Sequence, residues 1–396
     1  MDTKAIAAFL EPRHLELARS IAGIVDREFA PLEAPANDDA ARVAAVSLVR
    51  TMGESGLLRL AVPTAESAAG SGPELLALCL VRECLAAASP LADALFALQA
   101  LGSAPIALAG NSELRRRWLP EIAAGRAIAG FAMTEPEAGS DVAAIATTAR
   151  RDGDFYVLDG VKSFISNAGI ADFYCVFAST DRAKGTRGID CFVVPASTPG
   201  LRFVAPYVLS EPHPLGELAF DACRVPVGAR LGAEGEGFKI GMRTLDRLRP
   251  TVAAAACGIA GRALSEAIAH ARTRRQFGAP LADLQLVQAK IARMATDLTA
   301  ARLLTFSAAW EQDRGQAPES SAAGSGRRSS TGAAMAKLFA TEAAQRIVDD
   351  AVQIFGGRGV LASSVVDRLY RAVRALRIYE GTSEIQHLVI ARDLLR

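Results

Sequence analysis

The order of local patterns along the chain is the feature that most restricts its fold. A long N-terminal and a long C-terminal region place apolar residues three and four positions apart, the spacing of amphipathic helices. Between them, short apolar runs bounded by turn residues indicate β-strands at 154–158, 173–177 and 191–194. These strands follow one another without intervening helices, which favours an antiparallel sheet. We therefore predict an α+β fold, mostly α, with an N-terminal α-helical domain (1–129), a middle antiparallel β domain (130–236) and a C-terminal four-helix bundle (237–396).

The C-terminal region begins after a glycine-rich joint at 232–237 and contains four long helical patterns. They cover residues 238–275, 281–311, 332–355 and 366–396. Short links between long helices are typical of an antiparallel bundle. One link differs, because residues 318–332 are rich in Ser and Gly and predict a solvated surface loop.

Charge and apolar content exclude two large classes of function. The 396 residues carry 44 Lys and Arg against 43 Asp and Glu, a formal charge of +1, so no electrostatic footprint for nucleic acid is present. Hydrophobic residues make up 51% of the chain, yet charges interrupt the apolar segments, as Arg262 and Glu266 do in the Ala-rich stretch 252–268. We therefore predict no membrane span.

Cysteines and the N-terminal segment point to the cytoplasm. The six cysteines are widely spaced, and no C-x-x-C or Cys/His cluster predicts a metal site or a disulfide framework. Asp2, Glu11 and Glu16 lie within the first twenty residues, where a secretory signal requires an apolar core and a transit peptide contains few acids. A cytoplasmic protein without a metal is the expectation.

Five motifs occur in a fixed order along the chain. The first lies where the helical pattern gives way to strands and, like any Gly- and Ser-containing turn, could offer backbone N–H groups to a phosphate. Taken alone, such a stretch is more often only a turn. The motifs are Met133-Thr-Glu-Pro-Glu-Ala-Gly-Ser-Asp141, Gly160-Val-Lys-Ser-Phe-Ile-Ser-Asn-Ala-Gly169, Arg274-Arg-Gln-Phe-Gly-Ala-Pro-Leu281, Gln353-Ile-Phe-Gly-Gly-Arg-Gly359 and Ile378-Tyr-Glu-Gly-Thr-Ser-Glu-Ile-Gln386.

Together these motifs, which span nearly the whole chain, resemble the acyl-CoA dehydrogenase flavoprotein family. The resemblance implies an FAD cofactor between the β domain and the bundle, with a neighbouring subunit completing the site. It implies a homotetramer, a dimer of dimers, that passes electrons to an electron-transfer flavoprotein. The cofactor contacts that it implies are Met133, Thr134, Ser140, Phe164, Ser166, Arg274, Gln276, Phe277, Gln353, Gly357, Thr382 and Glu384.

The resemblance also implies the reaction and its base. Acyl-CoA dehydrogenation removes the α-proton of the thioester and passes the β-hydrogen as a hydride to flavin N5. The α-C–H is weakly acidic, so the reaction needs a buried carboxylate with a raised pKa beside it. Glu380 stands where many family members carry this base. Other members carry it on the first bundle helix, where this chain has Leu248, and that apolar residue favours Glu380.

The resemblance also implies which residues contact the substrate. The resemblance implies that Asp246 and Arg249 contact the pantetheine, although a structural ion pair also explains them. Tyr379 would line the acyl pocket. Ala94, Ala97 and Leu98 would line the acyl pocket, and core packing explains them equally well. Because they carry no charge, an aliphatic, branched or alicyclic acyl group is favoured over a dicarboxylic one; chain length and pathway are left open.

Two departures from the family pattern and two other functions remain open. Phe164 stands where Trp is usual, so the indole N–H is lost, and Ala372 replaces an Asp that commonly follows the Arg before the base. The same fold could instead support an acyl-CoA oxidase or a flavin monooxygenase-like relative that uses O₂. A non-catalytic CoA- or flavin-binding protein is the second alternative.

Overall fold

The computed structural model describes residues 2–67, 72–315 and 325–396, without the side chains of 325–329. These residues form two compact units. We call Met1–Leu32, Leu75–Asp93 and Arg247–Arg396 the helical unit, and Glu33–Glu74 and Ala94–Asp246 the sheet unit. Each unit is built from segments far apart in sequence.

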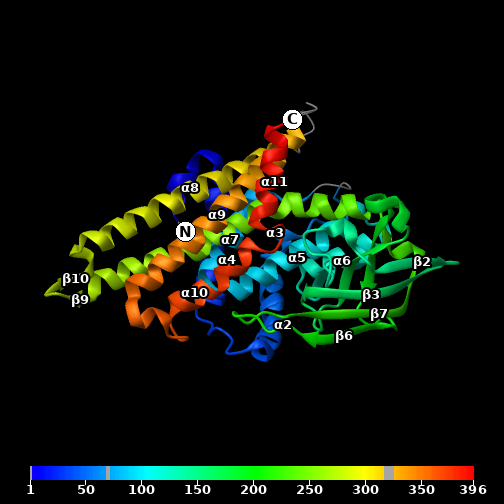
Figure 1. The fold of residues 1–396 in the computed structure, drawn as a ribbon, viewed down its shortest axis with the longest axis horizontal. Helices are drawn as coiled ribbons and strands as arrows, with labels where there is room; N and C mark the ends of the chain where they lie inside the picture. Colours follow the sequence, from blue (N-terminus) through cyan, green and yellow to red (C-terminus); the bar gives the residue numbers. More distant parts are fainter. Residues whose placement is uncertain (1, 68–71, 316–324) are drawn as a thin grey trace. The chain divides into compact units, whose positions relative to one another are not determined.

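The helical unit contains the long helices of the C-terminal region together with N-terminal helices (Figure 1). A two-stranded hairpin joins α7 to α8 at their ends (Figure 1). The elements are η1 (Lys4–Phe9), α1 (Pro12–Glu28), α4 (Leu75–Ala88), most of α7 (Gly237–Thr273), β9 (Arg275–Gln276), β10 (Ala279–Pro280), η5 (Leu281–Asp283), α8 (Gln285–Gly315), α9 (Ser325–Phe355), η6 (Gly356–Val360), α10 (Val365–Val373), η7 (Arg374–Arg377) and α11 (Ser383–Leu394).

Small side chains let the helices of this unit approach closely. Its buried core consists largely of alanines from α7, α8 and α9, with Ile and Val filling the remaining space. At Gly258 on α7, an added Cβ would lie 2.2 Å from the Glu83 carbonyl oxygen of α4. Because that separation is far inside van der Waals contact, only glycine permits this crossing. The alanine-rich composition thus serves close helix packing.

The sheet unit carries the large sheet, several helices and the first residues of α7 (Figure 1). In the described chain its eight strands run in the order β6-β7-β3-β2-β4-β5-β8, with β1 beside β4. The elements are α2 (Asp38–Glu54), α3 (Leu58–Ala61), most of α5 (Pro90–Ala109), α6 (Ser112–Ala123), β1 (Ala129–Ala132), η2 (Val142–Ala144), β2 (Thr148–Asp152), β3 (Phe155–Ser166), β4 (Phe173–Ser179), η3 (Arg182–Gly188), β5 (Ile189–Pro195), β6 (Leu201–Pro206), β7 (Leu215–Pro226), η4 (Val227–Ala229) and β8 (Arg230–Leu231).

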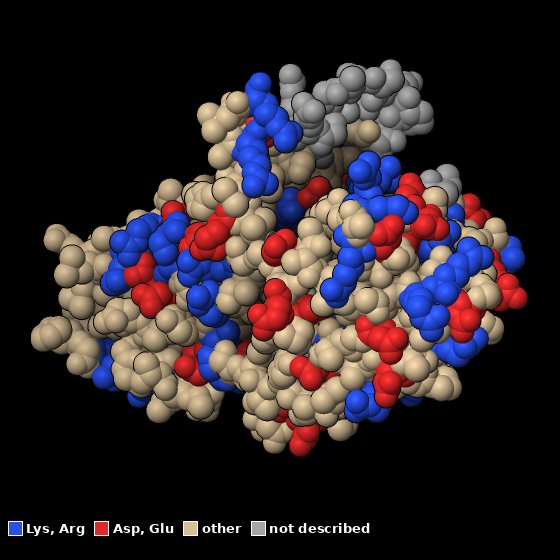
Figure 2. Space-filling model, turned by 45° about the vertical axis from the view of Figure 1, so that its right-hand side comes forward, with Lys and Arg blue, Asp and Glu red and all other residues tan. Residues whose placement is uncertain are grey.

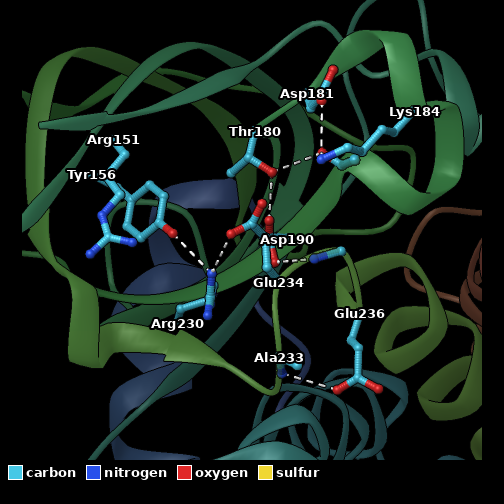
Figure 3. A network of polar contacts seen from close by, with 12 residues as sticks. Arg151, Tyr156, Thr180, Asp181, Lys184, Asp190, Arg230, Ala233, Glu234 and Glu236 are labelled. Carbon is cyan, nitrogen blue, oxygen red and sulfur yellow. Dashed lines mark hydrogen bonds and ion pairs between the residues drawn. The ribbon is translucent and has the colours of Figure 1, made fainter.

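A buried carboxylate fixes the glycine-rich joint that precedes α7. Asp190 is fully buried on β5 and accepts hydrogen bonds from the Thr180 hydroxyl at 2.6 Å and from the Gly235 amide at 2.9 Å (Figure 3). Beside it, Arg230 donates to the Tyr156 hydroxyl at 2.9 Å (Figure 3). A Cβ at Gly237 would meet the Asp190 backbone at 2.3 Å, so the joint needs glycine there. The start of α7 is thereby held against the sheet.

The predicted fold class is confirmed, with corrections to individual elements. Most strand pairs are antiparallel, but β4 pairs in parallel with β1 and with β2. The predicted helix 366–396 is wrong as one element, since α10, η7, a turn and α11 replace it. The predicted loop 318–332 is helical from Ser325, and its first part lies outside the described residues. The three-domain boundaries stay a prediction.

The cysteines and the most apolar helices are buried, as the high apolar content of the chain suggests. All six cysteines are free and buried. The helices α5 and α7 are long and apolar enough to cross a membrane by length and composition, and residues 94–112 carry no charge, contrary to the interruption expected above. However, 72% and 61% of their apolar windows are buried inside the protein, as in core helices. Positive and negative side chains alternate on the face in Figure 2, without a single-sign field.

Candidate active site

A strained turn in the helical unit presents Glu380. The turn lies between η7 and α11, and Glu380 has a φ of 54°, a left-handed conformation that L residues rarely adopt. Gly381 follows at 91°, where its missing Cβ removes the steric cost. In the described chain the Glu380 Oε2 is buried without a hydrogen-bond partner. A buried carboxylate oxygen left unpartnered, on strained backbone, indicates a site and not a packing contact.

Opposing electrostatic effects act on Glu380. Burial raises the pKa of its carboxyl group above the ordinary value, while the positive charges of Arg82, Lys337 and Arg249 lower it. The raised pKa shows that burial outweighs the three cations. A carboxylate whose pKa moves toward neutrality is suited to accept a proton from a weak carbon acid. The arrangement can therefore perform general base chemistry.

Arg82 is itself held by a buried carboxylate. Its side chain is 2% exposed and that of Asp93 is 5% exposed. The Arg82 Nε and Nη2 donate to the two Asp93 oxygens at 2.8 Å each, and Nη1 donates to the Thr251 hydroxyl at 3.0 Å. This two-pronged geometry is the strong form of an arginine–carboxylate pair. The charge of Arg82 also acts on Tyr379, the neighbour of Glu380.

In the sheet unit, the first and second motifs lie side by side. The Ser163 amide donates to the Thr134 carbonyl at 3.0 Å, which joins the segment after β1 to the end of β3. Buried Lys162 donates to the Met133 carbonyl at 3.0 Å and to the Glu135 carboxylate at 2.7 Å. Burial lowers the pKa of Lys162 to about 8. Met133 and Thr134 are thus fixed beside the second motif.

Phe164 and Ser166 lie farther along the same strand, β3, and each contacts another side chain. Phe164 is 61% exposed at a φ of 56°, and its ring lies 4.9 Å from that of Tyr207. The Ser166 hydroxyl lies 3.0 Å from His213 Nε2. Burial, with the charge of Arg42, lowers the pKa of His213 to about 4, so the ring is neutral at pH 7. An aromatic ring and a hydroxyl are displayed next to one another.

A hairpin in the helical unit carries the third motif. The turn residues Phe277 and Gly278 both have positive φ, 51° and 78°, as a type I′ turn requires. Phe277 is 94% exposed at the tip, and Arg274 and Gln276 are exposed beside it. An apolar ring exposed at the tip of a hairpin is typical of a surface that another molecule covers.

The fourth motif lies near the base of this hairpin. The rings of His270 and Phe355 stack at 4.2 Å and connect the ends of α7 and α9. Burial lowers the pKa of His270, and the charges of Arg358 and Arg274 lower it further, so two cations gather here. Gln353 and Gly357 are exposed at the end of α9. Exposed arginines and glycine backbone at one place suit an anionic group.

The other predicted contacts are placed as follows. Ala94, Ala97 and Leu98 are part-exposed and share one face of the largely buried α5, at spacings of three and four. Thr382 is the N-cap of α11 and accepts from the Ile385 amide at 3.3 Å. The remaining predicted residues lie on their expected elements: Ser140 and Glu384 are exposed, Asp246 is part-exposed and Arg249 is buried on α7, and Tyr379 is 38% exposed.

Sequence reasoning missed three charged residues around Glu380: Arg82, Asp93 and Lys337. Their signal was present, because Arg82 interrupts the apolar run of α4 and Lys337 lies among alanines on α9. Charged residues within an apolar helix are seldom buried unless they are paired or functional.

The residues present fit a dinucleotide with a flat aromatic ring system. Three of the five described non-glycine residues with positive φ are Phe164, Phe277 and Glu380, which the family resemblance singled out. Within the sheet unit, Phe164 and Ser166 offer a ring face and a hydroxyl. Within the helical unit, taken by itself, Arg274 with Arg358 offers positive charge. Strained backbone at several candidate residues is an expected property of a functional site.

Known proteins match the chain over its whole length. Residues 11–126, 130–223 and 235–395 match the N-terminal, middle and C-terminal domains of acyl-CoA dehydrogenase, respectively. The 3-(aryl)acrylate reductase of Clostridium sporogenes is 38% identical, covering 98% of this chain and 100% of its own. The mitochondrial short-chain specific acyl-CoA dehydrogenase of Rattus norvegicus is 39% identical, covering 98% and 91%.

Solved structures agree with these relatives. Butyryl-CoA dehydrogenase from Megasphaera elsdenii superposes with a TM-score of 0.87 at 32% identity, over 98% of this chain and 99% of its own. A chain from work on the electron transferring flavoprotein of Acidaminococcus fermentans gives 0.87 at 35%, over 100% of both. A glutaryl-CoA dehydrogenase from Mycobacterium smegmatis in complex with FADH2 gives 0.83 at 28%, over 98% and 96%.

The fold and the site define a flavin-dependent oxidoreductase. This chain belongs to the acyl-CoA dehydrogenase family, so the resemblance drawn from its motifs is confirmed. It is an enzyme, and FAD is its cofactor.

Proposed function

We propose that this enzyme removes hydrogen from the α and β carbons of an acyl-CoA thioester and that Glu380 takes the α-proton. The observation that carries the proposal is the buried, unpartnered Oε2 of Glu380 on a left-handed turn. FAD, when bound, supplies the acceptor for the β-hydrogen. In this proposal Glu380 supplies the proton acceptor, and its backbone amide stabilises developing charge on the thioester oxygen.

The surroundings of Glu380 suit this task. Burial removes solvating water and raises the pKa of the Glu380 carboxyl group. The positive charges of Arg82, Lys337 and Arg249 oppose this effect, because they favour the ionised carboxylate. Proton transfer to a base whose pKa is near the operating pH is the efficient case. Arg249 and Asp246 on α7 contact the pantetheine in this proposal, and Tyr379 lies against the acyl group.

The acyl group is proposed to be uncharged. Ala94, Ala97 and Leu98 present one small aliphatic face on α5, without a cation for a distal carboxylate. The relatives act on differing acyl groups by name, including a short-chain substrate and a 3-(aryl)acrylate. The same base can return a proton in the reverse direction, so reduction of an unsaturated thioester belongs to the same proposal.

Electron-transfer flavoprotein is the proposed electron acceptor, supported by the match to a chain studied with such a protein. Assembly into a homotetramer is proposed from the exposed ring of Phe277, which a second copy would cover in completing the FAD site through Arg274 and Gln276. The cytoplasm is the proposed location.

The decisive experiment compares Glu380→Gln with the unchanged holoenzyme. Straight, branched, alicyclic and aryl acyl-CoAs are mixed anaerobically with the enzyme, and loss of flavin absorbance is recorded. We expect Glu380→Gln to keep FAD and to lose about 10²–10⁴ of the reduction rate, the usual contribution of a general base. Glu380→Asp is the matched control, which keeps the charge and should retain part of the rate.

Two outcomes would oppose the proposal. Reduction by Glu380→Gln at the unchanged rate would remove Glu380 as the base. Rapid peroxide formation when the reduced enzyme meets air would favour the oxidase or monooxygenase-like alternative. Slow reoxidation in air with fast reduction of electron-transfer flavoprotein is the expected pair of results.

A further inference from the structure

A buried lysine joins α9 to the turn that carries Glu380. Lys337 is 1% exposed, and its Nζ donates to the Tyr379 carbonyl at 2.6 Å and to the Gly381 carbonyl. These two carbonyls belong to the residues on either side of Glu380. A buried ammonium group is costly unless its donors are used. Both of these Lys337 hydrogen bonds go to the backbone that sets the direction of Glu380.

Further contacts hold the same turn to the bundle. Gln386 on α11 donates to the Gly381 carbonyl at 2.8 Å. Glu342, one turn beyond Lys337 on α9, accepts from Arg377 and from the Ser383 hydroxyl at 2.7 Å each. The turn is therefore tied at both ends, and among the described side chains Lys337 is the one that bonds to both residues flanking Glu380.

We propose that Lys337 is a positioning residue for the dehydrogenation step, which holds Glu380 on its left-handed backbone and keeps a buried positive charge close to it. The proposal rests on the proposed function of Glu380. Without the two bonds, the turn can relax to ordinary φ values, and the carboxylate moves from its place. Because sub-ångström placement governs proton transfer, this loss should appear in the chemical step.

The charged groups around Glu380 fix the expected pH response. They come from several elements: Arg82 on α4, Asp93 on α5, Arg249 on α7 and Lys337 on α9. Lys337 lowers the pKa of Glu380, so removing its charge raises that pKa further. Burial lowers the pKa of Lys337 itself to about 8, against the opposing effect of Glu380. The Lys337 side chain is therefore positively charged below about pH 8 and loses this charge as the pH rises above 8.

The test uses the FAD-loaded enzyme, with Lys337→Met as the first variant and Lys337→Gln as the second. Gln keeps two N–H donors but no charge, and it serves if Met prevents folding. Lys290→Met is the matched control, since Lys290 on α8 pairs with Asp350, near the far end of α9 from Lys337, at 2.6 Å and is not among the groups acting on Glu380. Single-turnover flavin reduction is measured from pH 5 to 9, with FAD content and the thermal midpoint.

We expect Lys337→Met to retain FAD, to reduce it at least tenfold more slowly, and to shift the acid limb of the profile to higher pH. Lys337→Gln should show the same shift, and Lys290→Met should leave the limb unmoved. The proposal is overturned if the folded Lys337 variants keep the unchanged rate and limb while Glu380→Gln is inactive. If Glu380→Gln also keeps its rate, the proposed base has failed instead, so the two failures are distinguishable.

Discussion

Substitutions in the buried pair of Arg82 and Asp93 should all lower stability but should shift the pKa of Glu380 in opposite directions. Asp93→Asn removes one charge from a pair whose side chains are at most 5% exposed and turns an N–H₂ group toward the Arg82 donors. Breaking such a buried pair costs about 3–5 kcal/mol, because the remaining charge stays uncompensated. A unit of roughly 200 residues loses about 2–4 °C per kcal/mol, so a fall of about 6–20 °C in the thermal midpoint follows.

Arg82→Met should also destabilise the helical unit, since Asp93 is then left without its donors. The double variant Arg82→Met/Asp93→Asn removes both charges, and we expect its loss to be smaller than the sum of the two single losses by about 2 kcal/mol or more. The losses of stability are measured by urea and thermal unfolding. If the loss in the double variant equals the sum of the two single losses, Arg82 and Asp93 are not a coupled buried pair.

The two single variants should affect Glu380 in opposite directions. The Arg82 charge lowers the pKa of Glu380 and the Asp93 charge raises it. Arg82→Met therefore moves the acid limb of single-turnover flavin reduction to higher pH, and Asp93→Asn moves it to lower pH. A purely structural effect has no reason to change sign between two destabilising variants. Shifts in the same direction, or no shifts, would refute the electrostatic reasoning.

Two further predictions concern the sheet unit and the hairpin. His213 is neutral when folded, with a pKa lowered to about 4 against about 6.5 unfolded. Below pH 6.5 the unfolded state binds the extra proton, so about 3 kcal/mol of stability is present above pH 6.5 and lost as the pH falls toward 4. His213→Gln should flatten this dependence in urea unfolding at pH 7 and 4.5, and an unchanged slope would exclude His213 as its source. Phe277→Ser should weaken self-association in sedimentation velocity and lower FAD retention, whereas an unaltered oligomer would exclude the ring from the contact.

Local patterns identified the elements that bury continuous apolar surface. The strands β3, β4 and β5 overlap the predicted runs because their residues are mostly buried and turn residues bound them. The strand β6 escaped prediction because it is largely exposed and lacks the apolar run. Motif order supplied Glu380, which no periodicity could mark, since a glutamate before Gly-Thr is otherwise an ordinary cap.

The break before α11 shows where local pattern fails for a physical reason. Apolar spacing continues through 366–396, and η7 and the turn interrupt it because long-range bonds hold Tyr379 to Gly381 in place. The donor of those bonds, Lys337, is more than forty residues away in sequence. Propensity within a window cannot include a partner at that distance.

The charges around Glu380 lie on helices whose sequence already marks them as buried. The helix α4 is buried on every side from Leu75 to Ala86, so a charge within it has no solvated face to occupy. Arg82 must then be paired, and the nearest acid on the next helix, Asp93, is the partner that the structure provides. The same logic applies to Lys337, whose neighbours on α9 are buried alanines and whose partners are the carbonyls around Glu380. A cation on a helix without a solvated face must be paired with a carboxylate or with carbonyl groups. In this enzyme the groups that pair with Arg82 and with Lys337 both lie near the candidate base Glu380.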